Sequence, residues 1–249
     1  MHNTYFEYNN RSCAKVFLFP FAGGGASVFK KWQGEFGDIE VQPAHYPGRE
    51  DRIKEPLIDN INALVRDIFC AIQPYITDSL PYYLFGHSLG TKVVYELALL
   101  IKECPWLCQP AGVIISAGKA PCFHEENPIY YLSDSEFASE VARFEGTPKA
   151  ILENEKLLKF FLPMLRADFK IDETYVRNDI RKLDCPILGL MGTEDKELTL
   201  QELKKWSEYT TDVFDYKYIT GAHMFLNTNC KATVDAVKEF IEETRQSGE

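Results

Sequence analysis

The chain lacks the features that mark membrane, fibrous and disordered proteins. No stretch approaches the roughly 18 uninterrupted apolar residues that a membrane-spanning helix requires. There is also no linker, internal repeat or low-complexity segment, which excludes collagen-like, coiled-coil and disordered architectures. Residues 1–11 are polar and have no apolar h-region, so we expect neither a signal peptide nor membrane association.

Disulfide and metal patterns are missing as well. The seven cysteines are odd in number and scattered along the chain, which favours reduced thiols and a cytoplasmic location over a disulfide framework. Cys104 and Cys108 are the closest pair, but no further Cys or His at zinc-ligand spacing completes a site. We therefore expect no bound metal.

Positive charge is scarce too. The 249 residues include 27 Lys and Arg against 37 Asp and Glu, which gives a formal net charge of −10, and there is no basic run. An acidic chain of this kind is not expected to bind nucleic acid. With 45% of its residues in the apolar set, the chain can bury a sizeable core. The expected domain organisation is a single domain over 1–249.

Short apolar runs alternate with amphipathic stretches along the chain. Most of the runs are continuously apolar, as in parallel strands that are covered on both faces. The alternation predicts an α/β fold with a mostly parallel, doubly wound sheet, which binds ligands near the carboxyl ends of its strands. The expected strands are Val16–Phe19, Ile39–Val41, Tyr82–Phe85, Val113–Ser116, Ile187–Met191 and Phe214–Ile219.

Helical spacing fills the intervals between these strands. One predicted helix covers 58–72 and ends before Pro74. Thr199 and Glu202 have the spacing of a capping box and predict a helix that runs to about residue 209. Further helices are expected over 93–101 and 233–244.

One long interval breaks the alternation. No clear strand occurs over about 120–182. Ser133 and Glu136 open a predicted helix over 133–144, and a longer helical region over 155–175 is expected to be interrupted near Pro163. Roughly 60 residues are too many for a plain crossover, so this interval is predicted to be an inserted helical lid.

A possible nucleophile lies between a predicted strand and a predicted helix. The segment Gly86-His87-Ser88-Leu89-Gly90 matches the pattern G-x-S-x-G. Attack by a serine hydroxyl requires a sharp turn that lifts the side chain clear of the sheet, and flanking glycines let the backbone turn without clashes. We predict that Ser88 is a catalytic nucleophile; the alternative is a plain glycine-rich turn.

A serine nucleophile needs a base, and His223 is the candidate. It follows the last predicted strand and directly precedes the final helix, which places it on a loop at the carboxyl edge of the sheet. The other histidines lie in the polar tail, inside the turn, or on loops that break the order of acid and then base; they are His2, His87, His45 and His124.

The base needs an orienting carboxylate. The strand over 187–191 leads into Glu194 and Asp195, and both are candidates. Asp195 is favoured because a shorter carboxylate at this distance past the strand has the usual reach. The resulting order of Ser88, Asp195 and His223 is the order found in α/β-hydrolases.

A glycine run, Gly23–Gly25, follows the first predicted strand. It does not match a phosphate-loop pattern, and the dinucleotide pattern fails because Val28 occupies the position of the third glycine. In a serine hydrolase this position supplies a backbone N–H to the oxyanion hole. Ala22 and Leu89 are the two predicted donors.

Several motifs in one order along the chain carry a family resemblance. Together they are similar to the stand-alone type II thioesterases that accompany nonribosomal peptide and polyketide synthases, and related medium-chain fatty acyl thioesterases share the pattern. The resemblance runs from about Val16 to Phe240, with one departure at Thr91, where the family often has a further glycine. The motifs are Phe19–Gly24, Pro47–Glu50, Phe85–Gly90, Gly146–Pro148, Leu165–Asp168 and Gly221–Leu226.

The resemblance implies an α/β-hydrolase fold with a helical lid and a serine thioesterase that needs no cofactor of its own. Its substrates would be acyl or aminoacyl thioesters on the phosphopantetheine arm of acyl or peptidyl carrier proteins, in antibiotic or siderophore biosynthesis. The implied role is editing, in which stalled or wrong acyl groups are removed from a misprimed synthase. The enzyme is expected to act as a monomer.

Other functions stay open on the residues alone. A medium-chain fatty acyl thioesterase, a general carboxylesterase and an acyltransferase would use the same three side chains, whereas a non-catalytic carrier-binding protein would need none of them. Aromatic lid residues either line an acyl pocket or form the lid core; these are Phe123, Phe137, Phe144, Phe160 and Phe161. Basic residues near the expected mouth either steer a carrier or are merely solvated; these are Lys30, Lys31, Arg49, Arg52, Lys92 and Lys119.

Overall fold

A parallel sheet forms the centre of the molecule. The computed structural model describes residues 12–78, 80–144, 146–147 and 149–247, so the segment 1–11, with His2, and Pro148 lie outside the described residues. The six strands are all parallel and have the order β2-β1-β3-β4-β5-β6. The predicted strands and fold class are therefore confirmed. The strands are β1 (Ala14–Phe19), β2 (Ile39–Pro43), β3 (Tyr82–His87), β4 (Gly112–Ser116), β5 (Ile187–Gly192) and β6 (Phe214–Ile219).

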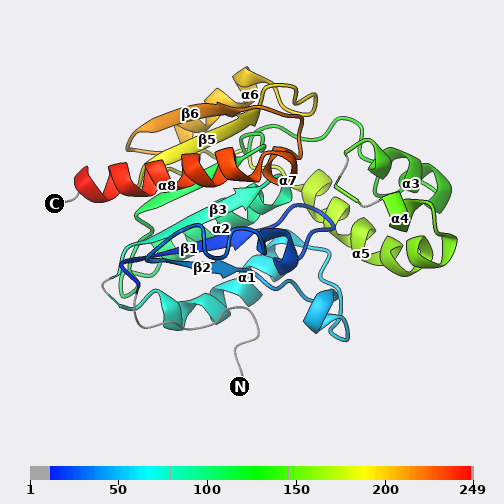
Figure 1. The fold of residues 1–249 in the computed structure, drawn as a ribbon, viewed down its shortest axis with the longest axis horizontal. Helices are drawn as coiled ribbons and strands as arrows, with labels where there is room; N and C mark the ends of the chain where they lie inside the picture. The colour runs from blue at the N-terminus through cyan, green and yellow to red at the C-terminus, as the bar shows by residue number, and fades with distance from the viewer. Residues whose placement is uncertain (1–11, 79, 145, 148, 248–249) are drawn as a thin grey trace.

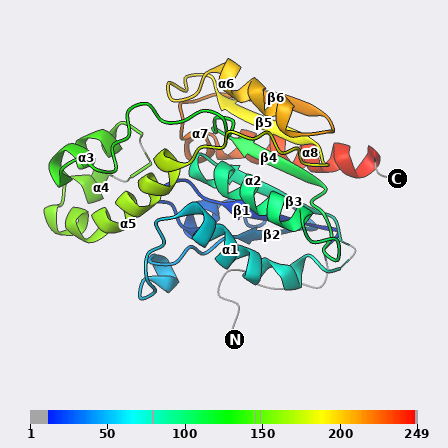
Figure 2. The ribbon, with the colours of Figure 1, turned by 180° about the vertical axis from the view of Figure 1, so that it is seen from behind.

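Helices cover both faces of this sheet (Figures 1 and 2). α8 (Cys230–Ser247) lies across one face, and α1 (Ile61–Ile72) and α2 (Leu89–Lys102) lie across the other. Every residue of β1, β3, β4 and β5 is buried. This double cover explains why the strand sequences are continuously apolar rather than alternating.

The predicted helices form, and the helix expected from residue 58 begins at Ile61, after a cap at Asn60 that was not predicted. The Asn60 side chain accepts a hydrogen bond from the Ala63 N–H at the start of α1. Thr199 and Glu202 form the capping box of α6 (Leu200–Lys204), which continues as the 3₁₀ helix η4 (Lys205–Tyr209). The sequence did not predict the short helix α7 (Phe225–Thr228). Within the described ranges, none of the helices combines the length and apolar character needed to cross a bilayer.

The strand order creates the place for a site. β1 lies between β2 and β3, and the connection after β1, through the 3₁₀ helix η1 (Ala26–Phe29), packs in the same core cluster as α8. The connection after β3 is α2, which belongs to the core cluster on the other face. Since the two connections diverge, a crevice opens at the carboxyl ends of β1 and β3.

The interval between β4 and β5 is helical, as the lid prediction required. It contains α3 (Asp134–Ala142), α4 (Lys149–Leu152) and α5 (Glu155–Thr174), which stand together beyond the end of the sheet in both views (Figures 1 and 2). Ser133 and Glu136 form the predicted capping box of α3. The helices enclose a small apolar core of their own, made of Ile129, Phe137, Val141, Leu162, Met164, Leu165 and Phe169.

The expected interruption near Pro163 is wrong. α5 is continuous over 20 residues with Pro163 inside it. A proline there has no N–H to donate to the preceding turn, and its ring crowds that turn. The flanking side chains of Leu162 and Met164 are nevertheless buried in the lid core. Packing of this apolar face outweighs the local cost of the proline, because tertiary contacts supply most of the stability of helices in proteins.

Glu173 connects α5 to the segment that precedes α3. Its Oε2 accepts hydrogen bonds from the N–H groups of Ile129 and Tyr130, both at 2.9 Å. Burial is the main cause that raises the pKa of Glu173 to about 7, and the two N–H groups act against this rise. Folding therefore favours the protonated form of the Glu173 carboxyl, which also joins α5 to the segment before α3 through two hydrogen bonds.

Replacing Glu173 by Gln should make the free energy of unfolding less dependent on pH. A carboxyl whose pKa is raised by folding stabilises the folded state below about pH 4.5, and this contribution is lost as the pH rises through about 7. Gln keeps an oxygen for both N–H groups but does not ionise. Between about pH 4 and pH 8, the free energy of unfolding of Glu173→Gln should thus rise relative to that of the wild type by on the order of 1 kcal/mol. Solvent access to the carboxyl makes this difference smaller than the pKa shift alone would give.

Denaturant titrations at both pH values check this expectation. Glu173→Ala is the matched control, because it loses both hydrogen bonds and should be less stable than the wild type at either pH. The same pH dependence in the wild type and in Glu173→Gln would contradict the role given to this carboxyl.

Candidate active site

Ser88 lies in a strained turn between β3 and α2. Its φ is 54° and its ψ is −116°, a combination that residues other than glycine rarely adopt. The neighbouring glycines make the turn possible because they lack a side chain. A Cβ on Gly86 would lie 2.2 Å from the Gly90 carbonyl oxygen, and a Cβ on Gly90 would lie 2.2 Å from the Phe19 carbonyl oxygen.

Hydrogen bonds hold this turn in place. The Ser88 N–H donates to the Ser116 carbonyl at the end of β4, at 2.8 Å. The Ser88 carbonyl accepts from the Thr91 N–H at 2.9 Å and from the Thr91 Oγ1 hydroxyl at 2.7 Å. Threonine at the departure from the family pattern thus adds a hydrogen bond at the start of α2.

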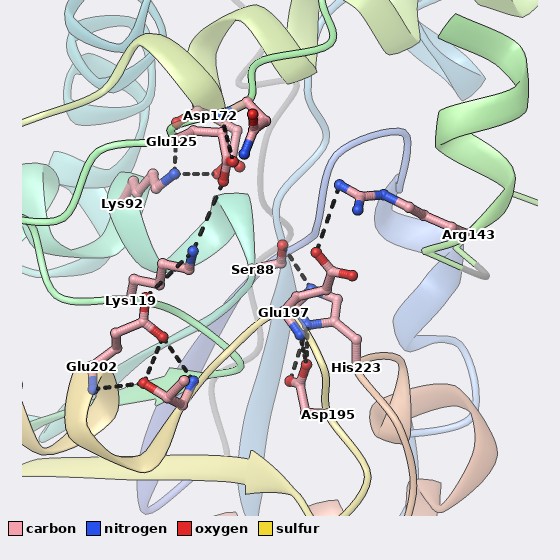
Figure 3. A network of polar contacts seen from close by, with 12 residues as sticks. Ser88, Lys92, Lys119, Glu125, Arg143, Asp172, Asp195, Glu197, Glu202 and His223 are labelled. Atoms are coloured by element: carbon pink, nitrogen blue, oxygen red, sulfur yellow. Dashed lines mark hydrogen bonds and ion pairs between the residues drawn. The ribbon is translucent and has the colours of Figure 1, made fainter. Parts of the chain in front are cut away.

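The structure brings together the three side chains that the sequence singled out. Figure 3 shows Ser88, His223 and Asp195 directed toward one another. His223 Nε2 lies 3.2 Å from Ser88 Oγ, and His223 Nδ1 lies 3.0 Å from Asp195 Oδ2 and 3.2 Å from Oδ1. Because a carboxylate only accepts, Nδ1 carries the proton and Nε2 is free to accept the Ser88 hydroxyl proton.

The geometry also separates the two candidate acids. Glu194 is exposed, and its backbone N–H donates to the Gly221 carbonyl at 2.9 Å. The Asp195 side chain is fully buried. Its Oδ1 accepts the Glu197 N–H at 2.9 Å, which holds the carboxylate against His223.

The three other described histidines have different surroundings. His45 lines a different cavity, His124 is exposed at the rim of the site, and His87 is buried below the turn. His124 lines a cavity that Ser88 and His223 also line, and His87 contacts the His223 main chain. His223 is therefore the histidine positioned as a base for Ser88.

Two adjoining cavities open at Ser88 and His223, under the lid. The first has a volume of about 40 Å³ and a mostly apolar wall, which includes Phe21, Val141, Phe144, Phe169 and Met224. The second has a volume of about 70 Å³ and a charged wall, which includes Lys92, Lys119, Glu125, Asp172 and Glu197. A larger cavity of about 530 Å³ lies at β2 and the 3₁₀ helices η1 and η2 (Glu50–Arg52), away from Ser88.

The lid aromatics divide between the two roles that the sequence left open. Phe144 lines both cavities, and Phe123 lines the charged one. Phe137 is fully buried in the lid core, and Phe161 packs against that core. Phe160 is 60% exposed and does neither.

The two residues predicted as oxyanion-hole donors flank the nucleophile. Ala22 follows β1 and lines the apolar cavity together with Ser88 and His223. Leu89 is the first residue of α2. The first N–H groups of a helix have no acceptor within the helix, so this position suits a donor to a bound anion.

A buried ion pair that the sequence analysis did not foresee holds the loop after β1. Arg49 donates to both carboxylate oxygens of Asp168, at 2.6 and 2.8 Å, and the two residues are 6% and 1% exposed. Asp168 also accepts the Gly23 N–H at 2.7 Å, and Arg49 donates to the Gly24 carbonyl at 2.9 Å. The lid helix α5 thereby fixes the loop that carries Ala22.

The expectation that basic residues at the mouth could steer a carrier is wrong for Arg49 and Arg52, because both are buried. Arg49 is engaged in the buried pair with Asp168. Arg52 is 7% exposed and bonded to a neighbouring glutamate. Lys92 Nζ lies 2.7 Å from Asp172 Oδ1 in α5. Arg49 and Arg52 are therefore internal supports, Lys92 stays in the wall of the charged cavity, and Lys30 and Lys31 are exposed.

Ion pairs connect the lid and the body around the charged cavity (Figure 3). Besides the contact between Lys92 and Asp172, Arg143 Nη2 lies 3.8 Å from Glu197 Oε2. Lys119 lies between Glu125 at 3.8 Å and Glu202 at 3.4 Å. In the part of the chain that the structure describes, no cluster of three or more His, Cys, Asp or Glu residues could hold a metal ion.

Comparisons with known proteins identify the family. The thioesterase domain profile matches residues 14–244. Thioesterase PikA5 from Streptomyces venezuelae is 31% identical over 94% of this chain and 83% of its own length, and the medium-chain S-acyl fatty acid synthase thioesterase from Homo sapiens is 31% identical over 88% and 83%. The structure of YbtT, a type II thioesterase from the yersiniabactin NRPS/PKS biosynthetic pathway, matches with a TM-score of 0.86 at 27% identity and covers 96% of both chains. The chain therefore belongs to the thioesterase domain family and is a hydrolase of thioesters.

Proposed function

We propose that this thioesterase removes acyl or aminoacyl groups from the phosphopantetheine arm of carrier proteins, and that Ser88, His223 and Asp195 are its catalytic residues. The observation that carries the proposal is the hydrogen-bonded chain from Ser88 Oγ through both nitrogens of His223 to Asp195. Relatives that act in nonribosomal peptide and polyketide pathways support the carrier as partner. The role we assign is editing, in which stalled or wrong acyl groups are cleared from a synthase.

The first half of the reaction forms an acyl-enzyme. His223 Nε2 takes the Ser88 hydroxyl proton while Ser88 Oγ attacks the thioester carbonyl carbon. Asp195 accepts the Nδ1–H and stabilises the imidazolium that results. The carbon–sulfur bond then breaks, and the pantetheine sulfur leaves as a thiol with the proton from His223.

The second half regenerates the enzyme. His223 takes a proton from water, whose oxygen attacks the acyl carbon on Ser88. The ester bond breaks, the acyl group leaves as a carboxylic acid, and Ser88 regains its proton from His223. In both halves the negative oxygen is assigned to the N–H groups of Ala22 and Leu89, and losing one such donor costs about 3 kcal/mol of transition-state stabilisation.

The size of the apolar cavity favours short acyl groups. Its volume is only about 40 Å³, and Phe144, Phe169 and Met224 line it, so a short acyl chain fits with less rearrangement of the packed wall than a long one. A medium-chain fatty acyl thioesterase is the second candidate, because the human enzyme of that description is 31% identical. A longer chain would require Phe144 or its part of the lid to move.

Asp195→Asn should lower kcat by about 10²- to 10⁴-fold. An asparagine can present an N–H group to His223 Nδ1 and so favours the wrong tautomer. Glu194→Gln is the matched control next to it, and it should change kcat by less than about tenfold because Glu194 is exposed. Steady-state kinetics on a short acyl thioester checks both. A greater loss in Glu194→Gln would show that the acid is misassigned.

A panel of acyl-carrier proteins, from acetyl to long-chain and aminoacyl, tests the proposed substrate. Each should be turned over with a kcat/KM at least about tenfold above that of the same acyl group on a short cysteamine thioester, because the arm and carrier add binding energy. The shortest acyl groups should react fastest. Ser88→Ala provides the blank and should lose on the order of 10⁴- to 10⁶-fold in turnover.

Three outcomes would change the assignment. Equal kcat/KM on carrier and cysteamine substrates would remove the carrier as partner. Faster turnover of matched oxygen esters would indicate a carboxylesterase, and transfer of the acyl group to an added amine or alcohol would indicate an acyltransferase.

A further inference from the structure

His87 is a fully buried histidine that the reaction scheme above does not use. It is the last residue of β3 and directly precedes Ser88, and its exposure is 0%. Its Nδ1 lies 2.8 Å from Ser116 Oγ, and its Nε2 lies 3.0 Å from the backbone carbonyl oxygen of His223. Both ring nitrogens are thus engaged, one of them with the main chain of the proposed base.

These two partners determine where the imidazole proton lies. A carbonyl oxygen only accepts, so Nε2 must carry the proton and donate it; Nδ1 then accepts the hydroxyl proton of Ser116. Burial, and after it the proximity of His223, holds the pKa of His87 well below its ordinary value. The ring is therefore neutral and adds no positive charge beside the imidazolium that His223 becomes during the reaction.

The hydrogen bond from His87 connects the base to the strand of the nucleophile. The loop that carries His223 also receives the Glu194 N–H at the Gly221 carbonyl, at 2.9 Å, and the Asn229 Nδ2 at the Thr220 carbonyl, at 3.2 Å. Those contacts come from segments that follow β5 and α7. The contact from His87 comes from the last residue of β3, directly before Ser88. It therefore connects the main chain of the proposed base to that of the proposed nucleophile through a single side chain.

Aromatic packing leaves His87 little freedom to move. The centre of the Phe225 ring lies 5.2 Å from the centre of the His87 ring, and that of the Phe21 ring lies 6.0 Å from it, each at an interplanar angle of 76°. Phe225 follows the His223 loop, and Phe21 precedes Ala22. The position of the loop matters because Ser88 Oγ and His223 Nε2 are 3.2 Å apart, at the long end of a productive hydrogen bond.

We propose that His87 is a positioning residue, whose Nε2–H holds the main chain of His223 so that the imidazole stays within reach of Ser88. The proposal rests on the proposed function, since it takes His223 to be the base. It assigns His87 no contact with the substrate.

Two substitutions separate the two hydrogen bonds of His87. Glutamine places its terminal amide near the position of Nε2 and can still donate to the His223 carbonyl, whereas asparagine reaches only about as far as Nδ1 and Ser116. His87→Gln should keep kcat within about fivefold of the wild type. His87→Asn should lose about 10- to 100-fold in kcat with little change in KM, because a displacement of about 1 Å at the reacting atoms can cost 10²-fold.

The test also needs a variant that is destabilised without a change at His87, and a reagent that reacts directly with Ser88. Val237→Ala removes buried methyl groups from the middle of α8 and leaves both hydrogen bonds of His87 in place; it should lower the melting temperature without lowering kcat. Labelling of Ser88 by a fluorophosphonate should follow the same order as kcat, from wild type and His87→Gln down to His87→Asn. Equal rates in the two His87 variants, or losses that follow the melting temperature in all variants, would overturn the positioning role.

Nitrogen-15 NMR of the wild-type imidazoles tests the proposal without any variant. His87 should show a protonated Nε2 and an unprotonated Nδ1 at every pH at which the enzyme is active. A proton on Nδ1, or a cationic ring in that range, would overturn the proposal. If the wild type is labelled by the fluorophosphonate but the two His87 variants do not differ as expected, only the positioning role is rejected. If the wild type is neither labelled nor able to hydrolyse thioesters, the proposed function is rejected as well.

Discussion

The site depends on one backbone constraint, the left-handed conformation of Ser88. A residue held in such a conformation costs about 1–3 kcal/mol and persists only when its surroundings determine it fully. Here the absence of side chains at Gly86 and Gly90 makes the turn sterically possible, and hydrogen bonds with Ser116 and Thr91 hold it. The turn raises the serine hydroxyl to the edge of the sheet where the loops after β1, β5 and β6 also end, so side chains distant in sequence meet there.

The lid is coupled to this edge through charge. The buried pair of Arg49 and Asp168 is weak evidence for added stability, because desolvation offsets the attraction between the charges, but removal of one partner alone would leave a buried charge at a cost of about 3–5 kcal/mol. The pair instead fixes the position of the loop after β1, since Asp168 also accepts a hydrogen bond from the Gly23 N–H. A movement of α5 would therefore be transmitted to the loop that carries Ala22.

Local patterns in the sequence were sufficient for the strands, the turn at Ser88 and the positions of His223 and Asp195, because each depends on its immediate neighbours and on chain order. Contacts between distant segments were not accessible in this way. Arg49 and Asp168 are 119 residues apart, so nothing near Arg49 indicates that it is buried and paired. Pro163 was misjudged for a similar reason, since its local cost is visible in the sequence and the lid packing that outweighs it is not. The contact between His87 and the His223 carbonyl likewise joins residues 136 positions apart, so no local pattern indicates it.

Acylation of Ser88 during turnover is the central claim, and rapid-quench mass spectrometry measures it directly. The protein is mixed with an acyl-carrier thioester, quenched in acid within the first turnover and digested. The account predicts that the peptide containing Ser88 gains the mass of the acyl group, and that His223→Ala slows the appearance of this species. Release of free thiol with no acylated Ser88 peptide at any time, or an acyl group found on another residue, would contradict the account.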